Sequence, residues 1–204
     1  MTKIKNLLFD LGGVLLNIDY HKTADAFKKL GVTKFDELYS QAGANDLFEA
    51  LETGKITEAD FYATLQQYCN PNTSKEQIEA AWNSMLLNFR IKSLDWLKSL
   101  KGQYDIFLLS NTNSIHLKAF NKIFKEEVNQ LSLDDYFIKA YYSHNIQMRK
   151  PYTETYHFVL NDAGLKAEET LFIDDSINNI EGAKLAGLQV HHLSDGSKIE
   201  NMPL

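Results

Sequence analysis

The sequence predicts an α/β fold, a doubly wound parallel sheet with an inserted helical segment. Five short apolar runs recur along the 204 residues, and helix-length segments separate the later runs. Strands that alternate with helices are typical of a parallel sheet covered by helices on both faces. The long interval between the first two runs lacks strand alternation and has apolar residues at helical spacing instead.

The interval that follows the first predicted strand, residues 6–9, is expected to be helical throughout. Its apolar residues recur three or four positions apart, as on the buried face of an amphipathic helix. This spacing is found at Phe61, Leu65 and Tyr68, and at Ile78, Ala81, Trp82, Met85 and Leu86. Two pairs resemble capping boxes, Thr57 with Asp60 and Ser74 with Gln77. The aromatic residues are expected to form the core of this segment and are assigned no ligand.

These patterns predict two domains. Residues 1–16 and 90–204 are expected to form the α/β core, and residues 17–89 the helical insertion. Short hinges are expected near Asn17 and at residues 89–91. The polar residues after Ser194 predict a mobile tail.

The four later strands are expected at residues 106–109, 140–142, 171–173 and 188–193. Two helices among them have clear boundaries. Pro151 stands near the start of one helix, and Gly164 closes it. Ser176 precedes the other helix, and Gly187 follows it.

Composition excludes several classes of function. The chain has 27 Asp and Glu against 21 Lys and Arg, a net charge of −6, which opposes binding to nucleic acid. No apolar run approaches the roughly 18 residues of a membrane helix, so no membrane association is expected. The lone Cys69 and the absence of a signal-peptide core predict a cytoplasmic protein. The oligomeric state stays open.

Polar residues follow the apolar runs at four predicted strand ends. They are Asp10-Leu11-Gly12-Gly13, Ser110-Asn111, Lys150-Pro151 and Asp174-Asp175-Ser176. In open α/β sheets the ligand site lies off the carboxyl ends of the strands, so we expect these side chains to converge. Each motif alone is common, because Asp, Ser and Gly also occur wherever strands turn into loops or helices begin.

The tandem Asp174 and Asp175 predict a metal site. Two carboxylates drawn toward a desolvated strand end are unfavourable unless a cation compensates them. Mg²⁺ prefers oxygen ligands and is commonly held by one or two carboxylates. The alternative is that Asp175 only caps the next helix, a role that Ser176 can fill. With Asp10, Lys150 and Mg²⁺ the site is near neutral, so binding of a phosphate dianion requires both cations.

The four motifs, in this order and with a helical insertion after the first, resemble the haloacid dehalogenase superfamily of hydrolases. The resemblance covers essentially the whole chain and implies a Rossmann-like core with a helical cap of the C1 type. Residues 9–14, 109–113, 148–151 and 172–183 are most similar to the bacterial α-D-glucose-1-phosphate phosphatases.

This resemblance implies catalytic roles for three residues. Asp10 is the nucleophile that forms an aspartyl-phosphate intermediate, and Ser110 hydrogen-bonds the phosphate. Lys150 contacts both the Asp10 carboxylate and the phosphate. Gly12 and Asn111 join Ser110 and Lys150 in substrate binding, and the backbone N–H groups after Asp10 and Ser110 complete the cradle. These roles agree with the needs of phosphoryl transfer, which are mainly positioning and charge neutralisation.

The resemblance also implies a ligand set for Mg²⁺. Asp10, the carbonyl of Gly12 and Asp175 bind the ion, and Asp174 supports it directly or through water. Asn179 falls where many relatives have a second acidic residue.

One departure from the family pattern concerns the proton donor. Most phosphatases of the superfamily have an aspartate two residues after the nucleophile as general acid and base, but here that residue is Gly12. The glucose-1-phosphate phosphatases also have glycine there. Because a sugar leaves readily from its anomeric phosphate and needs less acid assistance, we expect a preference for anomeric esters. Asp19, His21 and His144 could donate a proton, and none is assigned this role.

The sequence thus predicts a magnesium-dependent phosphatase of small phosphate monoesters, in particular sugar phosphates such as glucose 1-phosphate. Two alternatives stay open. A 2-haloacid dehalogenase attacks carbon with the same aspartate and uses no metal, but it has little use for the Asp174-Asp175 pair. A catalytically silent sugar-phosphate-binding or regulatory protein keeps the fold alone, whereas this chain retains Asp10, Lys150 and Asp175.

Overall fold

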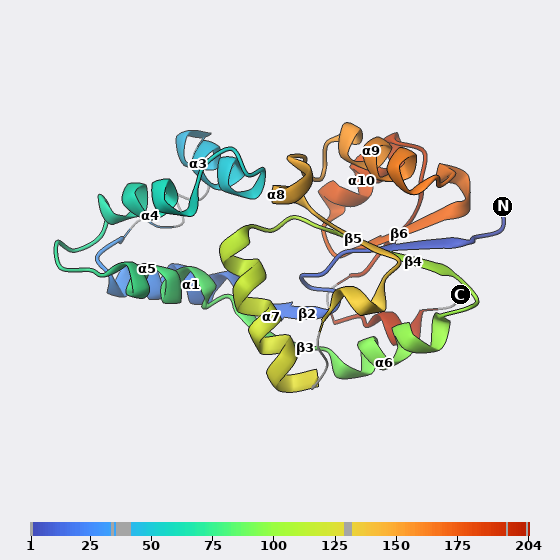
Figure 1. Ribbon diagram of the computed structural model, residues 1–204, viewed down its shortest axis with the longest axis horizontal. Coiled ribbons are helices and arrows are strands. Elements are labelled where there is room, and N and C mark those ends of the chain that lie inside the picture. The colour runs from blue at the N-terminus through green and yellow to red at the C-terminus, as the bar shows by residue number, and fades with distance from the viewer. Residues whose placement is uncertain (1, 34, 36–41, 129–131, 195, 203) are drawn as a thin grey trace.

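A five-stranded parallel sheet forms the centre of the molecule in the computed structural model, with strand order β5-β4-β1-β6-β7 (Figure 1). The structure describes residues 2–33, 35, 42–128, 132–194, 196–202 and 204, with the backbone alone at residues 42–46. The strands are β1 (Asn6–Phe9), β4 (Asp105–Ser110), β5 (Lys139–Tyr142), β6 (Thr170–Asp174) and β7 (Gln189–His192). All neighbouring pairs are parallel. The predicted fold class and its five strands are confirmed.

Helices cover both faces of the sheet because successive side chains of a strand point to opposite faces. Leu7 and Phe9 of the central strand β1 pack with α6 and α7 on one face. Leu8 packs with α9 and α10 on the other face. Figure 1 shows α9 and α10 above the sheet and α6 below it.

The core helices are α6 (Ile91–Leu100), α7 (Ser114–Val128), α8 (Ser143–Ile146), α9 (Thr153–Ala163) and α10 (Ile177–Leu185). Short 3₁₀ helices η1 (Asp134–Tyr136) and η2 (Ala167–Glu169) lie between them. The predicted boundaries at Gly164 and Ser176 are confirmed as the caps of α9 and α10. Among the described residues, no helix combines the length and apolar character needed to cross a membrane.

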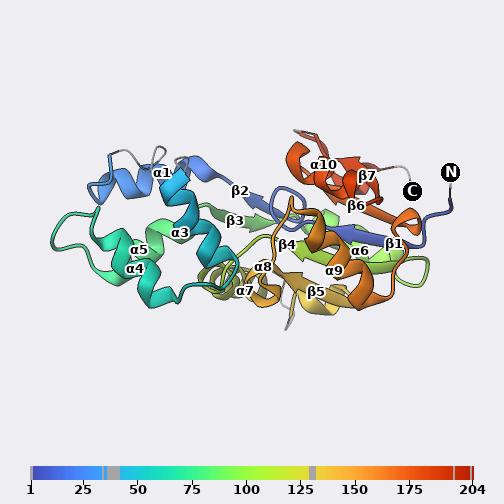
Figure 2. The same cartoon turned by 90° about the horizontal axis from the view of Figure 1, so that it is seen from above.

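The helical insertion extends beyond the carboxyl edge of the sheet (Figures 1 and 2). Its described helices are α1 (Tyr20–Lys29), α3 (Ala42–Glu52), α4 (Glu58–Gln66) and α5 (Lys75–Asn83). They pack around their own apolar cluster, in which Phe27, Phe48, Phe61 and Trp82 are buried. Both predicted capping boxes are present, at the starts of α4 and α5. The aromatic residues therefore form the predicted core of this segment.

The prediction that the interval is helical throughout is wrong at its two ends. Strands β2 (Leu16–Ile18) and β3 (Leu86–Phe89) pair as an antiparallel ribbon at the predicted hinges. The backbone groups of the two crossing segments must be satisfied where they meet, and pairing achieves this. Strands of three and four residues are too short to show alternation, so the sequence pattern did not reveal them.

Two of the proposed helical stripes consequently end early. Helix α5 ends at Asn83, so Met85 lies beyond it and Leu86 begins β3. Tyr68 lies beyond the end of α4 and is exposed. Apolar residues just past a helix end continued the helical spacing without belonging to the helix.

The predicted mobile tail is wrong for residues 196–202. A 3₁₀ helix, η3 (Ile199–Asn201), packs against α6, and Ile199 is fully buried in the core. The Ser93 hydroxyl also donates a hydrogen bond to Glu200 Oε2 at 2.7 Å. Two apolar residues, Ile199 and Met202, pack this segment against the core, which the polar composition concealed.

Candidate active site

Three of the predicted site residues lie at the same edge of the sheet because their strands are neighbours. Asp10 directly follows β1, Ser110 ends β4 and Asp174 ends β6. The backbone N–H of Asp10 donates to the Ile173 carbonyl at 2.9 Å, which continues the pairing of β1 with β6 past the end of the strand. All three side chains are buried. The topology thus brings together groups that are far apart in the sequence.

Lys150 connects two of these carboxylates. Its Nζ lies 2.6 Å from Asp10 Oδ1 and 2.6 Å from Asp174 Oδ2, and the residue is 1% exposed. Burial alone would lower the pKa of Lys150, but the attraction of Asp10 and Asp174 outweighs it and raises that pKa. The ammonium is therefore charged and holds the two carboxylates together.

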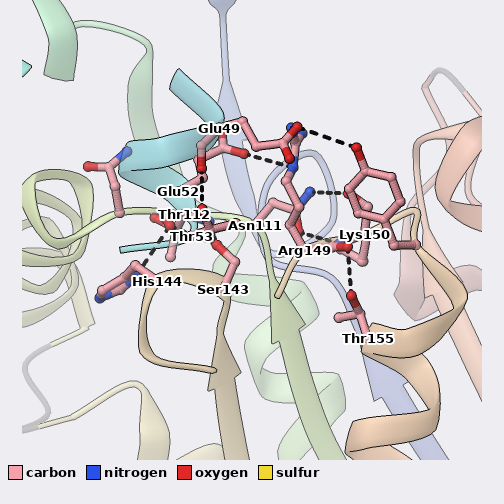
Figure 3. Close-up of polar contacts among 12 residues, drawn as sticks. Glu49, Glu52, Thr53, Asn111, Thr112, Ser143, His144, Arg149, Lys150 and Thr155 are labelled. Carbon is pink, nitrogen blue, oxygen red and sulfur yellow. Dashed lines mark hydrogen bonds and ion pairs between the residues drawn. The ribbon is translucent and has the colours of Figure 1, made fainter. Parts of the chain in front are cut away.

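The loop before α9 is held so that Lys150 reaches this position. The Asn111 amide donates to the main-chain carbonyl of Lys150 at 2.9 Å and accepts from its N–H at 2.9 Å (Figure 3). The Thr155 hydroxyl donates to the Arg149 carbonyl at 2.7 Å. The Asn111 side chain, which sequence analysis assigned to the substrate, is thus engaged in positioning Lys150.

Asp174 is hydrogen-bonded on both carboxylate oxygens. Its Oδ1 accepts from the Ser176 N–H at 2.8 Å and from Asn179 Nδ2 at 3.0 Å. Its Oδ2 accepts from Asn179 at 3.1 Å in addition to Lys150. Four hydrogen bonds use most of the capacity of one carboxylate. Asp174 and Asn179 accordingly hold the ammonium in place.

The third carboxylate completes a cluster that fits a divalent cation. Asp10, Asp174 and Asp175 offer oxygen atoms within 4.8 Å of one another. Burial raises the pKa of Asp10 to about 7, and burial together with Asp174 raises the pKa of Asp175. Three carboxylates beside one ammonium leave excess negative charge, which a hard cation such as Mg²⁺ would neutralise.

Gly13 allows Asp175 to approach the loop that follows β1. Its φ of +70° favours glycine, and a Cβ at this position would overlap Asp175 Oδ2. Gly13, the second glycine of the first motif, is therefore needed for packing, because any larger residue would push Asp175 away from Asp10.

A cavity of about 300 Å³ opens over this cluster. Its base is formed by the predicted residues Asp10, Gly12, Ser110, Asn111, Lys150, Asp175 and Asn179. The helical insertion and the ribbon contribute the opposite wall, with Ile18, Tyr20, Glu52, Trp82, Met85 and Leu86. This volume falls at the lower end of the range for small-molecule sites.

The three residues considered as proton donors do not line this cavity. Asp19 caps α1, where its Oδ1 accepts from the His21 N–H at 3.0 Å. His144 Nδ1 lies 3.3 Å from the Thr112 carbonyl, and His144 is not among the residues that line the cavity. None of them is placed to protonate a group above Asp10.

Glu52 is a cavity residue that sequence analysis missed. It is the last residue of α3, where the negative end of the helix dipole disfavours a carboxylate. An acidic residue at this end of a helix was the available signal. His116 was also missed; it lines the cavity and stacks on Trp82 with ring centroids 4.7 Å apart.

Comparison with known proteins agrees with this geometry. A family model described as haloacid dehalogenase-like hydrolase matches residues 4–187. The D-ribitol-5-phosphate phosphatase of Bacteroides thetaiotaomicron is 32% identical, over 95% of this chain and 94% of that protein. A haloacid dehalogenase-family enzyme of the same species, solved with magnesium and inorganic phosphate, is 38% identical, covers 96% of this chain and 97% of its own, and superposes with a TM-score of 0.87.

A third relative is a haloacid dehalogenase-like hydrolase of Porphyromonas gingivalis. It is 33% identical, covers 96% of this chain and 93% of its own, and superposes with a TM-score of 0.85. The family model and these relatives span nearly the whole chain, so the predicted superfamily is confirmed. The chain belongs to the family of haloacid dehalogenase-like hydrolases.

Proposed function

We propose that this hydrolase is a magnesium-dependent phosphatase of small, hydroxyl-rich phosphate monoesters, with Asp10 as its nucleophile. The observation that carries the proposal is the buried ammonium of Lys150 between Asp10 and Asp174, with Asp175 completing the acidic cluster. The ribitol-phosphate phosphatase and the magnesium and phosphate complex among the relatives support the same chemistry.

Mg²⁺ fits the residues that line the base of the cavity. Asp10, Asp175 and the Gly12 carbonyl would hold the ion, while Asp174 and Asn179 support it from behind. Bound there, the cation neutralises negative charge on the phosphoryl group and lets it approach a carboxylate.

The residues of the chain divide the reaction into two steps. The carboxylate of Asp10 attacks phosphorus, the bond to the ester oxygen breaks, and the departing alkoxide takes up a proton from solvent, which the hydrolytic step returns. Water then attacks the phosphorus of the aspartyl phosphate, which releases inorganic phosphate and restores Asp10. Lys150 fixes the nucleophile through its 2.6 Å contact, and the Ser110 hydroxyl with the N–H groups of Leu11 and Asn111 binds the phosphate oxygens.

The helical insertion serves as the cap that selects the alcohol. We assign residues 17–89 to this cap and residues 1–16 and 90–204 to the core. Residues of both parts line the cavity. The cap wall combines the Tyr20 and Trp82 rings with the Glu52 carboxylate, a mixture suited to a short polyol or sugar. Gly12 provides no general acid, which favours good leaving groups such as the anomeric oxygen of glucose 1-phosphate.

Phosphate release from an ester panel tests this function. The panel contains D-ribitol 5-phosphate, glucose 1-phosphate and glucose 6-phosphate, each with and without Mg²⁺. A 2-haloacid is assayed in parallel for halide release under the same two conditions. We expect magnesium-dependent release of phosphate, with glucose 1-phosphate turned over faster than glucose 6-phosphate. Equal turnover of the two glucose esters would contradict the anomeric preference. Halide release without metal would indicate a dehalogenase. Absence of any product would indicate a catalytically silent binding protein.

A further inference from the structure

Glu52 of the cap and Arg149 of the core meet at the wall of the cavity (Figure 3). Their side chains are 17% and 28% exposed, so little water reaches the pair. Figure 3 shows Glu49 and Glu52, both from α3, beside Arg149. This arrangement places a carboxylate and a guanidinium at the wall of the cavity.

The pair is close but incompletely hydrogen-bonded. Glu52 Oε2 and Arg149 Nε lie 3.2 Å apart. Both atoms are buried, and neither has a partner in hydrogen-bond geometry within the described part of the chain. Buried polar atoms nearly always have a partner from protein, water or ligand. These two atoms have almost no accessible surface, so a ligand would meet the other acceptor and donor positions of the two side chains, which both line the cavity.

A hydroxyl group matches this combination better than other groups. It carries one donor and two acceptor positions, so a single hydroxyl in the cavity can donate to the Glu52 carboxylate and accept from the Arg149 guanidinium. A phosphate would be repelled by Glu52, and an ammonium would be repelled by Arg149. An apolar group would give neither side chain a hydrogen-bond partner.

We propose that Glu52 and Arg149 together bind a hydroxyl of the substrate alcohol and determine the preference of the enzyme for hydroxyl-rich esters. The inference rests on the proposed function, because it needs the phosphoryl group to lie at Asp10. Arg149 precedes Lys150, whose ammonium contacts Asp10, so a hydroxyl at Arg149 and a phosphorus at Asp10 belong to one small molecule in one cavity.

Glu49 offers a matched control on the same helix. Its Oε2 lies 3.1 Å from Arg149 Nη1, so it pairs with the same guanidinium. It is one turn before Glu52 and is not among the residues that line the cavity. If the cluster only fastens the cap to the core, the two carboxylates are equivalent; if it binds substrate, Glu52 alone affects selectivity.

The test compares Glu52→Gln and Glu49→Gln on D-ribitol 5-phosphate and on 4-nitrophenyl phosphate, whose alcohol has no further hydroxyl. We expect Glu52→Gln to lower kcat/KM for ribitol 5-phosphate about 10- to 100-fold, mainly through KM, since a charged hydrogen bond is lost. We expect a much smaller loss on 4-nitrophenyl phosphate, so the ratio of kcat/KM for the two esters falls in Glu52→Gln and keeps its wild-type value in Glu49→Gln. Arg149→Lys, which keeps the charge but moves the donor, is expected to reproduce the selective loss.

Two results would overturn the inference while the proposed function stands. One is an equal loss on both substrates, or an equal loss in the Glu49 and Glu52 variants, which indicates a fastening role. The other is unchanged ribitol 5-phosphate kinetics in Glu52→Gln. A wild-type enzyme that releases phosphate from neither ester would contradict the proposed function itself and the inference with it.

Discussion

Two charged clusters face the same cavity and differ in how completely their members are paired. Lys150 holds Asp10 and Asp174 at 2.6 Å each, and all three residues come from the core. Glu52 and Arg149 lie 3.2 Å apart without hydrogen-bond geometry, and they come from the insertion and the core. Lys150 is hydrogen-bonded to both carboxylates of the first cluster, whereas the contact in the second falls outside hydrogen-bond geometry.

This difference separates chemistry from recognition. Groups that position a nucleophile must be fixed before the substrate arrives, and the buried core provides that rigidity. Groups that select an alcohol need an unfilled donor and acceptor, which an interface between two parts of the chain can supply. The comparison predicts that changes in the core cluster affect every substrate, whereas changes in the second cluster affect only hydroxyl-rich ones.

The largest effect is expected from Asp10→Asn. An amide at this position cannot attack phosphorus, so phosphate release should fall by about 10³-fold or more on every ester. Steady-state phosphate release on D-ribitol 5-phosphate and 4-nitrophenyl phosphate measures it. Unequal losses on the two esters would contradict the prediction that changes in the core cluster affect every substrate.

Lys150→Met should cause the largest loss of stability. It leaves Asp10 and Asp174 buried without their shared cation, which typically costs about 3–5 kcal/mol. Urea unfolding at neutral pH gives this difference, and Arg149→Met, which lies in the less buried cluster, is the comparison. If the two variants lose equal stability, the core cluster is no more tightly integrated than the second one.

His116 provides a pH-dependent test of the contact between core and insertion. Its Nδ1 accepts from the Asn113 amide and its Nε2 donates to the Trp82 carbonyl, so the ring is neutral. Burial lowers its pKa from 6.5 to about 4. As the pH falls, the imidazole of His116 therefore binds a proton in the unfolded chain before it does so in the folded protein. The contribution of the neutral ring to the free energy of unfolding is fully present above pH 6.5 and declines as the pH falls toward 4.

The loss at the acidic end of this window should be on the order of 2–3 kcal/mol. Urea unfolding of the wild type and of His116→Gln from pH 4 to pH 7 measures it, because glutamine removes the titrating group. A wild-type curve with the same slope as the variant would show that His116 does not contribute the dependence.

The smallest effect is expected from Gly54→Ala, which perturbs only the second cluster. Gly54 has a φ of +65°, and a Cβ there would lie 2.5 Å from the His144 carbonyl of the core. Alanine should cost about 1–2 kcal/mol and displace the end of α3 that carries Glu52. KM for ribitol 5-phosphate should rise while 4-nitrophenyl phosphate turnover is retained. A proportionate loss on both esters would instead show that the position of the insertion governs the core cluster.

The core site was predictable because three of its residues lie at the carboxyl ends of buried strands. Asp10, Ser110 and Asp174 needed only the expected sheet topology to meet, since parallel strands end at one edge. The structure adds what each group contacts, in particular that Asn111 positions Lys150 through its main chain.

The second cluster and the ribbon were not predictable in the same way. Glu52 reaches Arg149 only because the insertion docks on the core, and no local pattern encodes that docking. Strands β2 and β3 are too short for a periodic signal, and their stability comes from pairing with each other. Ile199 was hidden among polar neighbours although it is fully buried.

Trapping the phosphorylated enzyme tests the central claim most directly. The enzyme is mixed with D-ribitol 5-phosphate and Mg²⁺, quenched with borohydride, which reduces an acyl phosphate to an alcohol, and digested for mass spectrometry. We predict reduction at residue 10 that requires both the ester and Mg²⁺. Phosphate release without any modification of Asp10, or modification that needs no metal, would contradict a magnesium-assisted aspartyl-phosphate mechanism.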